Sequence, residues 1–239
     1  MSTTSPYLFL NKQEVYDVGF NGETGKAILD GFSEYGLKGL AFWENGFRNI
    51  TTTDKDIATV ADLSGLKIRT MANEIHLEAW KAMGANPTPM AFGELFTGLQ
   101  QGTVDGQENP LPTADAASIQ EVQSYLTYWT GAYDCLFFCM NAELYNSLSP
   151  ELQAIVDEAG QAACEYEREL NRSQDQEIMD KWAEAGVEIT ELTPEAAAEF
   201  AEASAPVYDE FADELTPELI ELSPASLRLM LAPLSPPPN

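Results

Sequence analysis

The sequence predicts an α/β fold, and three observations point to this class. Short apolar runs alternate with amphipathic helical patterns up to Asn109, which is typical of βαβ units and of a mostly parallel sheet. A helix of about 35 residues is expected from Pro150; at 1.5 Å per residue it would span about 50 Å, which favours a chain of two lobes. The 239 residues are 44% hydrophobic, which is enough to form a core.

The elements of the first half follow from hydrophobic spacing and from glycine and proline breakers. A helix over residues 23–35 carries Ala27, Ile28 and Phe32 on one face and ends at Gly36. Prolines require an extended segment, and glycines mark the ends of helices. The further elements expected are a strand at 37–43, a polar, turn-rich stretch at 51–66, a strand at 67–69, a helix at 73–83, an extended segment at 86–90, a helix from Phe92 to Gly102 with Leu95, Phe96 and Leu99 on one stripe, and a polar strand end at Gln107, Glu108 and Asn109.

The second half becomes mainly helical. Ser149 is a typical N-cap for the long helix, and Pro150 suits its first position because proline lacks the N–H that would be unpaired there. The other elements expected are strands at 125–129, 136–140 and 187–190, a helix at 194–213, and an extended or frayed tail at 216–239.

The charge of the chain excludes several classes of function. Its 39 acidic residues against 12 lysines and arginines give a net charge of −27, which repels nucleic acids and anionic membranes. No window reaches the ~18 apolar residues that cross a bilayer, so direct membrane insertion is not expected, and the first residues lack the features of a signal peptide. The three cysteines, Cys135, Cys139 and Cys164, are expected to be core residues rather than a disulfide or metal site.

Two arginines are the strongest candidates for binding. Arg48 and Arg69 are the arginines of the first 150 residues, and each follows a predicted strand or its exit turn. A guanidinium matches a carboxylate bidentately, and ligands collect at strand ends in α/β folds. The alternative is that both arginines pair with nearby acids such as Glu44 or Asp62, and the sequence favours neither role.

Catalytic motifs are missing from the sequence. The single histidine, His76, is expected at the surface, and it has no second histidine with which to share a metal. Acid–base chemistry with Glu94, Asp105 or Glu108 is a weak alternative, because acids are common in this chain. Most aromatic residues are expected in the core; Phe92, which follows a proline-bounded segment, is the best candidate for a pocket.

Four motifs, in this order and spacing, resemble the solute-binding proteins of TRAP transporters of the DctP type. They are Asn45-Gly-Phe-Arg48, Asp62-Leu-Ser-Gly-Leu-Lys-Ile-Arg69, Gly84-Ala-Asn-Pro-Thr-Pro-Met-Ala-Phe92 and Val104-Asp-Gly-Gln-Glu-Asn-Pro110. The resemblance runs from about Tyr7 to Phe211. It implies a two-lobed periplasmic receptor, not an enzyme and without cofactor or metal, that closes on a small organic acid. The partners it implies are membrane permease subunits driven by a sodium gradient.

The resemblance also implies roles for four residues. Arg69 matches the arginine that pairs bidentately with the ligand carboxylate, and Arg48 matches a second cationic contact. Asn109 matches the amide that hydrogen-bonds this carboxylate, and Phe92 the aromatic ring against the ligand body. Gln107 and Glu108 are expected to give structural support.

The resemblance further divides the chain. Residues 1–45 and 134–175 are expected to form lobe I, and residues 46–133 and 176–215 lobe II, with hinges near 43–49 and 130–136.

The sequence departs from the family in two places. Members begin with a cleaved signal peptide and two further βα units, and the chain starts after them, so the first lobe is expected to be incomplete. Gly131 stands where many members carry a bulkier polar residue. Two alternatives therefore stay open: a non-binding remnant or half-protein that needs an N-terminal partner, and, more remotely, a hydrolase with Glu94 or Glu108 as general base.

Overall fold

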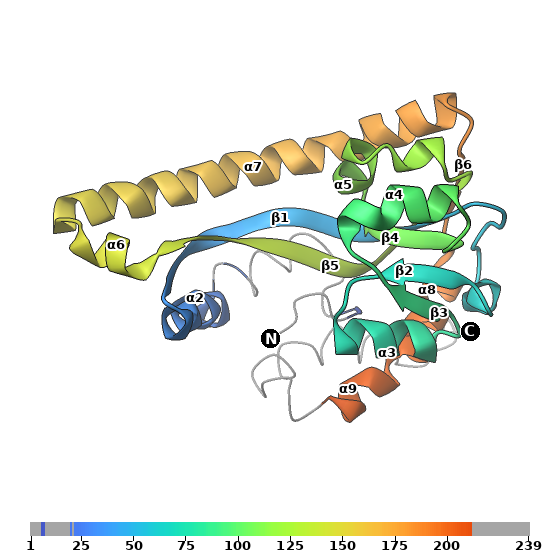
Figure 1. The fold of residues 1–239 in the computed structure, drawn as a ribbon, viewed down its shortest axis with the longest axis horizontal. Coiled ribbons are helices and arrows are strands. Elements are labelled where there is room, and N and C mark those ends of the chain that lie inside the picture. The colour runs from blue at the N-terminus through green and yellow to red at the C-terminus, as the bar shows by residue number, and fades with distance from the viewer. Residues whose placement is uncertain (1–5, 8–19, 21, 212–239) are drawn as a thin grey trace, which may run out of the picture.

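The computed structural model describes residues 6–7, 20 and 22–211, and one mixed sheet of six strands organises this part of the chain (Figure 1). The strands are β1 (Leu37–Thr52), β2 (Lys67–Thr70), β3 (Asn86–Pro89), β4 (Gly106–Pro110), β5 (Tyr125–Asn141) and β6 (Glu188–Glu191), in the order β3-β2-β4-β1-β5-β6. β2 is parallel to β3 and β4, and β5 to β6, but β1 is antiparallel to β4 and β5. The sheet is therefore mixed: three of its five strand pairings are parallel, as predicted, but its longest pairing, between β1 and β5, is antiparallel.

Strands β1 and β5 are much longer than predicted. β1 has 16 residues where the sequence predicts a strand at 37–43, and β5 has 17 residues that join two predicted strands. Their pairing shifts register three times, once between Glu44 and Gly46, and Gly46 has a φ of 113°. Bulges of this kind bend a strand without ending it. Gly46 therefore marks a bend within a continuous strand.

The helices agree closely with the sequence pattern. The long helix is confirmed, and its N-cap Ser149 accepts a hydrogen bond from the N–H of Leu152. The helix predicted at 194–213 is broken at Pro206, which starts a second short helix; residues 212–213 lie outside the described chain. The helices are α2 (Glu23–Gly31), η2 (Phe32–Tyr35), η3 (Val60–Leu63), α3 (Glu74–Ala82), α4 (Phe92–Gln100), α5 (Leu111–Ala116), η4 (Ile119–Glu121), α6 (Ala142–Ser147), α7 (Pro150–Glu184), α8 (Pro194–Ser204) and α9 (Pro206–Glu210).

We call residues 46–133 and 171–211 the body, where helices cover both faces of the sheet (Figure 1). α3 and α8 lie against one face, and α4, α5 and the C-terminal part of α7 cover the other. The first core contains Ile50, Ile68, Trp80, Trp129 and Phe200, and the second contains Leu95, Leu99, Leu126, Ile178 and Trp182. Burial of each such side chain stabilises the fold by roughly 1.5 to 3 kcal/mol, so the ends of β2 and β4 lie on a rigid frame.

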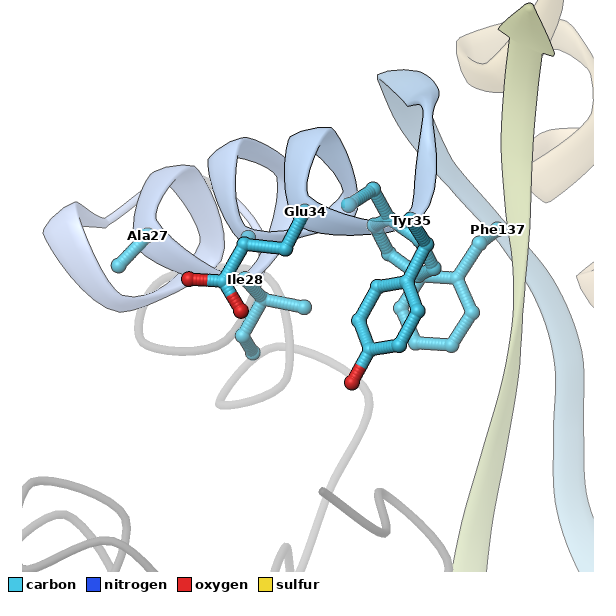
Figure 2. Close-up of a pocket in the computed structure, with 7 residues that line it drawn as sticks. Ala27, Ile28, Glu34, Tyr35 and Phe137 are labelled. Atoms are coloured by element: carbon cyan, nitrogen blue, oxygen red, sulfur yellow. The ribbon is translucent and has the colours of Figure 1, made fainter.

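We call residues 22–45 and 134–170 the arm, which extends from the body along β1, β5 and α7 (Figure 1). Of the ten large hydrophobic side chains that are exposed within the described residues, nine lie on the arm. A hollow of about 440 Å³ opens between α2, η2 and β5, and Figure 2 shows Tyr35 and Phe137 at its wall. The nine are Tyr35, Leu37, Leu136, Phe137, Leu144, Leu152, Ile155, Tyr166 and Leu170.

Two expectations about the chain can be compared with the fold. All three cysteines are free thiols; Cys135 and Cys164 are buried as predicted, and Cys139 is half-buried. Among the described helices, none combines the length and the apolarity needed to cross a membrane.

Candidate functional site

The predicted ligand residues lie where β2 and β4 end. Arg69 pairs in register with Gln107, and Asn109 follows on the same strand. Because side chains alternate along a strand, these three share the sheet face covered by α4, and Glu108 faces the opposite side. Phe92 is the first residue of α4. The fold therefore brings Arg69, Asn109 and Phe92 to the carboxyl ends of parallel strands.

Arg69 is a buried arginine that has no acidic partner among the described residues. Arg69 is 3% exposed, and its Nε and Nη2 both donate to the carbonyl oxygen of Met90, at 3.0 and 2.7 Å. Within the described part of the chain, no carboxylate lies within salt-bridge distance and Nη1 donates no hydrogen bond. The ring of Phe92 lies 5.8 Å from Cζ. Burial lowers the pKa of Arg69, and the nearby charge of Arg48 adds to this effect while Glu108 opposes it.

Arg48, in contrast, is fully occupied by protein groups. It is 1% exposed, and its Nε and Nη2 bind both carboxylate oxygens of Glu108. Nη1 donates to Oδ2 of Asp134 at 2.7 Å, and Nη2 also donates to Oδ1 of Asn109 at 3.0 Å. The alternative that Arg48 pairs with acids is therefore confirmed, but the acids are Glu108 and Asp134, because Glu44 pairs with Arg172.

For Arg69 the same alternative is wrong within the described residues, since Asp62 pairs with Lys55 and not with Arg69. Local sequence distance was a poor guide to these pairs because the strands bring distant acids together. Whether Arg48 contacts a ligand stays a prediction.

His76 is buried, so the prediction of a surface histidine is wrong. Its residue is 2% exposed, and its Nε2 lies 3.0 Å from Oε1 of Glu108. The indole nitrogen of Trp80 lies 3.3 Å from the same nitrogen. On the inner face of α3, a buried acid from β4 gives the histidine a polar partner, so it can lie inside the protein. Sequence spacing does not show this partner.

Glu108 carries a negative charge on the sheet face opposite α4. Burial alone would raise its pKa, but the charges of Arg48 and His76 and their hydrogen bonds outweigh burial and hold the pKa at about 2. Because Glu108 is fully buried, its carboxylate is a counter-charge for these groups and is closed to a substrate. This agrees with the structural support expected of it.

A chain of hydrogen bonds fixes the amide of Asn109. Its Nδ2 donates to Oε1 of Gln107 at 2.6 Å, and Nε2 of Gln107 donates to Oγ1 of Thr51 at 2.9 Å, which donates to Oε1 of Gln123 at 3.0 Å. The two ends of this chain fix the donor and the acceptor of every hydrogen bond in it. At one end the Arg48 guanidinium can only donate, and at the other end Nε2 of Gln123 donates to a backbone carbonyl, which can only accept. Asn109 therefore has one N–H left to donate.

The aromatic residues behave largely as predicted. Phe92 is 45% exposed, whereas Phe42, Trp80 and Trp129 are buried in the core. At Gly131 an added Cβ would meet the indole of Trp129 at 2.1 Å, so the ring fills the space that a side chain would need.

Within the described residues, no group of three or more histidine, cysteine or acidic side chains is arranged to hold a metal.

Comparison with known proteins identifies the family. Residues 3–215 match the DctP family, described as bacterial extracellular solute-binding protein, family 7. The chain belongs to the DctP family. The resemblance of the four motifs is thus confirmed, and members of this family bind solutes.

Relatives and solved structures of the DctP family extend this result. The chain is 40% identical over 186 residues to the 2,3-diketo-L-gulonate-binding periplasmic protein YiaO of Escherichia coli K12, covering 77% of the chain and 56% of that protein. A sugar acid binding protein from Advenella mimigardefordensis in complex with galactonate has a TM-score of 0.86 and 34% identity, over 94% of the chain and 72% of the other. A TRAP periplasmic solute binding protein from Polaromonas bound to D-erythronate has a TM-score of 0.83 and 32% identity, over 96% and 73%.

These solved neighbours are two-lobed periplasmic binding proteins, so the predicted fold class is confirmed. The chain spans about half the length of the curated relatives it matches.

Proposed function

We propose that this DctP-family chain captures a small organic carboxylate in the periplasm as the solute-binding subunit of a TRAP transporter. In this proposal it passes the solute to membrane permease subunits and catalyses no reaction. The names of its relatives support a carboxylate ligand: 2,3-diketo-L-gulonate, galactonate and D-erythronate are all organic acids.

The observation that carries the proposal is the unpaired charge of Arg69. In a chain with a net charge of −27, acids are plentiful, yet this buried guanidinium binds only one carbonyl oxygen within the described residues. A buried charge without a partner is unfavourable, and charge-assisted hydrogen bonds contribute roughly 1.5 to 3 kcal/mol each. A ligand carboxylate would supply the missing partner.

The four predicted residues take distinct roles in this proposal. Arg69 binds the carboxylate through Nη1 and the outward part of its guanidinium fork, and the remaining N–H of Asn109 donates to the same group. The exposed ring of Phe92 packs against the ligand body. Arg48, the second cation of the site, donates to Oδ1 of Asn109 and so orients the amide.

The proposed closure uses the division into lobes. Residues 1–45 and 134–175 form lobe I, and residues 46–133 and 176–215 form lobe II, with the ligand between them. The bulged pairing around Gly46, and the positive φ of 50° at Thr130, supply places where the long strands can bend.

A paired ligand titration tests the proposal. Isothermal titration calorimetry of the full chain compares galactonate with galactitol, which has the same carbon skeleton but a neutral end. We expect saturable binding of the acid and none of the alcohol at the same concentrations. Equal binding of both, or no binding of any organic acid in a wider thermal-shift screen, would contradict the proposal.

A second candidate is supported by the arm. Nine exposed hydrophobic side chains are more than a free surface usually carries, so binding competence requires a further polypeptide that covers the arm. Thermal-shift measurements with and without an added segment equivalent to the part of the E. coli relative that the chain does not span separate the candidates. A rise in melting temperature and in ligand affinity only with the segment supports the second.

A further inference from the structure

We propose that the site at Arg69 selects ligands with one carboxylate and an uncharged remainder, and discriminates against dicarboxylates. This inference rests on the proposed function and narrows its ligand class. It follows from the count of charges around the site, from the free hydrogen-bond donors, and from the positions of the other cations.

The charge count leaves one cation for the ligand. Arg48 divides its bonds between the carboxylates of Glu108 and Asp134. If His76 is neutral, these two acids more than balance Arg48; if His76 is protonated, it pairs with Glu108 and Asp134 balances Arg48. In either state, Arg69 is the single positive charge of this group without a carboxylate partner. One ligand carboxylate therefore uses all the positive charge that the group offers.

The free hydrogen-bond donors also match a single ligand carboxylate. Nη1 of Arg69 has no hydrogen bond within the described residues, and Asn109 retains one N–H after its bond to Gln107. The carbonyl oxygen of the Asn109 amide is occupied by Arg48. Arg69 has five N–H groups and uses two of them on Met90, so within the described residues the site presents three free N–H groups of Arg69 and one of Asn109. These four donors match the roughly four lone-pair sites of a single carboxylate.

The other cations of the body are committed or remote. Four of them each pair with an acid: Lys55, Lys81, Lys181 and Arg172. Lys67 begins β2, at the opposite end of the strand from the site. A second carboxylate on the ligand would therefore lose its hydration without gaining an ion pair from the described body, in a chain that already carries a net charge of −27.

Matched pairs of acids test this inference. Calorimetry at pH 7 compares D-galactonate with galactarate, and D-erythronate with tartrate, so that each pair keeps its chain length and differs by one carboxylate. In any pair that shows binding, we expect the monocarboxylate to bind at least tenfold more tightly than the dicarboxylate. Equal or tighter binding of the dicarboxylate would overturn the inference and leave the proposed function intact. Binding of no organic acid at all would overturn both.

Charge-removal variants give an independent test. Glu108→Gln removes a buried negative charge, and Asp134→Asn removes one from a side chain that is 13% exposed. Each is expected to reduce the disadvantage of the dicarboxylate by roughly tenfold, as unit charges several ångström apart interact at an effective dielectric constant of about 20. Glu199→Gln removes an exposed acid on α8 and is expected to leave the ratio unchanged.

Asp134→Asn keeps the test valid if Glu108→Gln fails to fold, and circular dichroism checks both variants. An unchanged ratio of affinities in a folded Glu108→Gln or Asp134→Asn protein would overturn the inference.

Discussion

Arg48 and Arg69 lie on two strands of one sheet, yet their surroundings differ completely. Arg48 is bound by Glu108, Asp134 and Asn109, and all of its nitrogens are occupied. Arg69 binds only the carbonyl of Met90 within the described residues. The difference teaches that burial alone does not separate a structural arginine from a binding one. The hydrogen-bond and ion-pair partners do: they indicate a structural role for Arg48, and they support our proposal that Arg69 binds the ligand.

The largest expected effect separates the two arginines by stability. Arg48→Ala leaves the carboxylate of Glu108 buried without its main partner, which should lower the free energy of unfolding by roughly 3 to 5 kcal/mol. Arg69→Ala removes bonds to one carbonyl and should cost about 1 kcal/mol. Urea denaturation measures both values. Similar losses in the two variants would contradict the comparison.

The second effect is a dependence of stability on pH that comes from Glu108. Its pKa is about 2 in the folded protein against an ordinary 4.5, so folding favours the ionised form. Its contribution, about 3 kcal/mol, is fully present above pH 4.5 and is lost as the pH falls towards 2.

Thermal unfolding from pH 7 to pH 2 measures this contribution as the difference between the wild-type chain and Glu108→Gln. The difference should shrink through the acid window. A constant difference would show that Glu108 is not the paired carboxylate described here.

A smaller effect is expected at Gln107, which links Asn109 to Thr51. Gln107→Leu leaves Nδ2 of Asn109 without its acceptor and Oγ1 of Thr51 without the N–H that it accepts, so the free energy of unfolding should fall by roughly 1 to 3 kcal/mol. Affinity for the carboxylate should fall several-fold, because the Asn109 amide loses a bond that orients it. Calorimetry and urea denaturation of the same sample test both, and full affinity in the variant would exclude the orienting role.

The smallest effect is expected at Phe92, the exposed ring beside Arg69. Phe92→Ala should change the free energy of unfolding by less than about 0.5 kcal/mol, as is usual for exposed positions. It should weaken ligand binding by a few-fold through lost contact with the ligand body. Phe96→Ala, on the same helix but half-buried, is a control that should reduce stability more than affinity.

Local patterns in the sequence were sufficient for much of the fold. The cap at Ser149 and the long apolar face predicted the helix Pro150–Glu184, and proline spacing predicted the extended segment before Phe92. The full lengths of β1 and β5 were missed, because glycines within bulges resemble glycines in turns. The direction of β1 was missed because apolar patterns carry no information about direction.

The site was only half predictable for a different reason. Arg69 follows a strand and matches a motif, so its place was apparent from the sequence. The partners of Arg48 lie 60 and 86 residues away, and His76 meets an acid 32 residues away. Such pairs depend on the strand register and on helix packing, which a single sequence does not reveal.

One measurement tests the central claim most directly: the affinity of Arg69→Ala for an organic acid that the wild-type chain binds. Lys81→Ala, which removes an exposed cation from α3, is the matched control. We expect calorimetry to give an affinity at least ~100-fold weaker for Arg69→Ala, as for the loss of two charged hydrogen bonds, with a native circular dichroism spectrum and with full affinity in the control. Unchanged affinity in a folded Arg69→Ala protein would contradict the account.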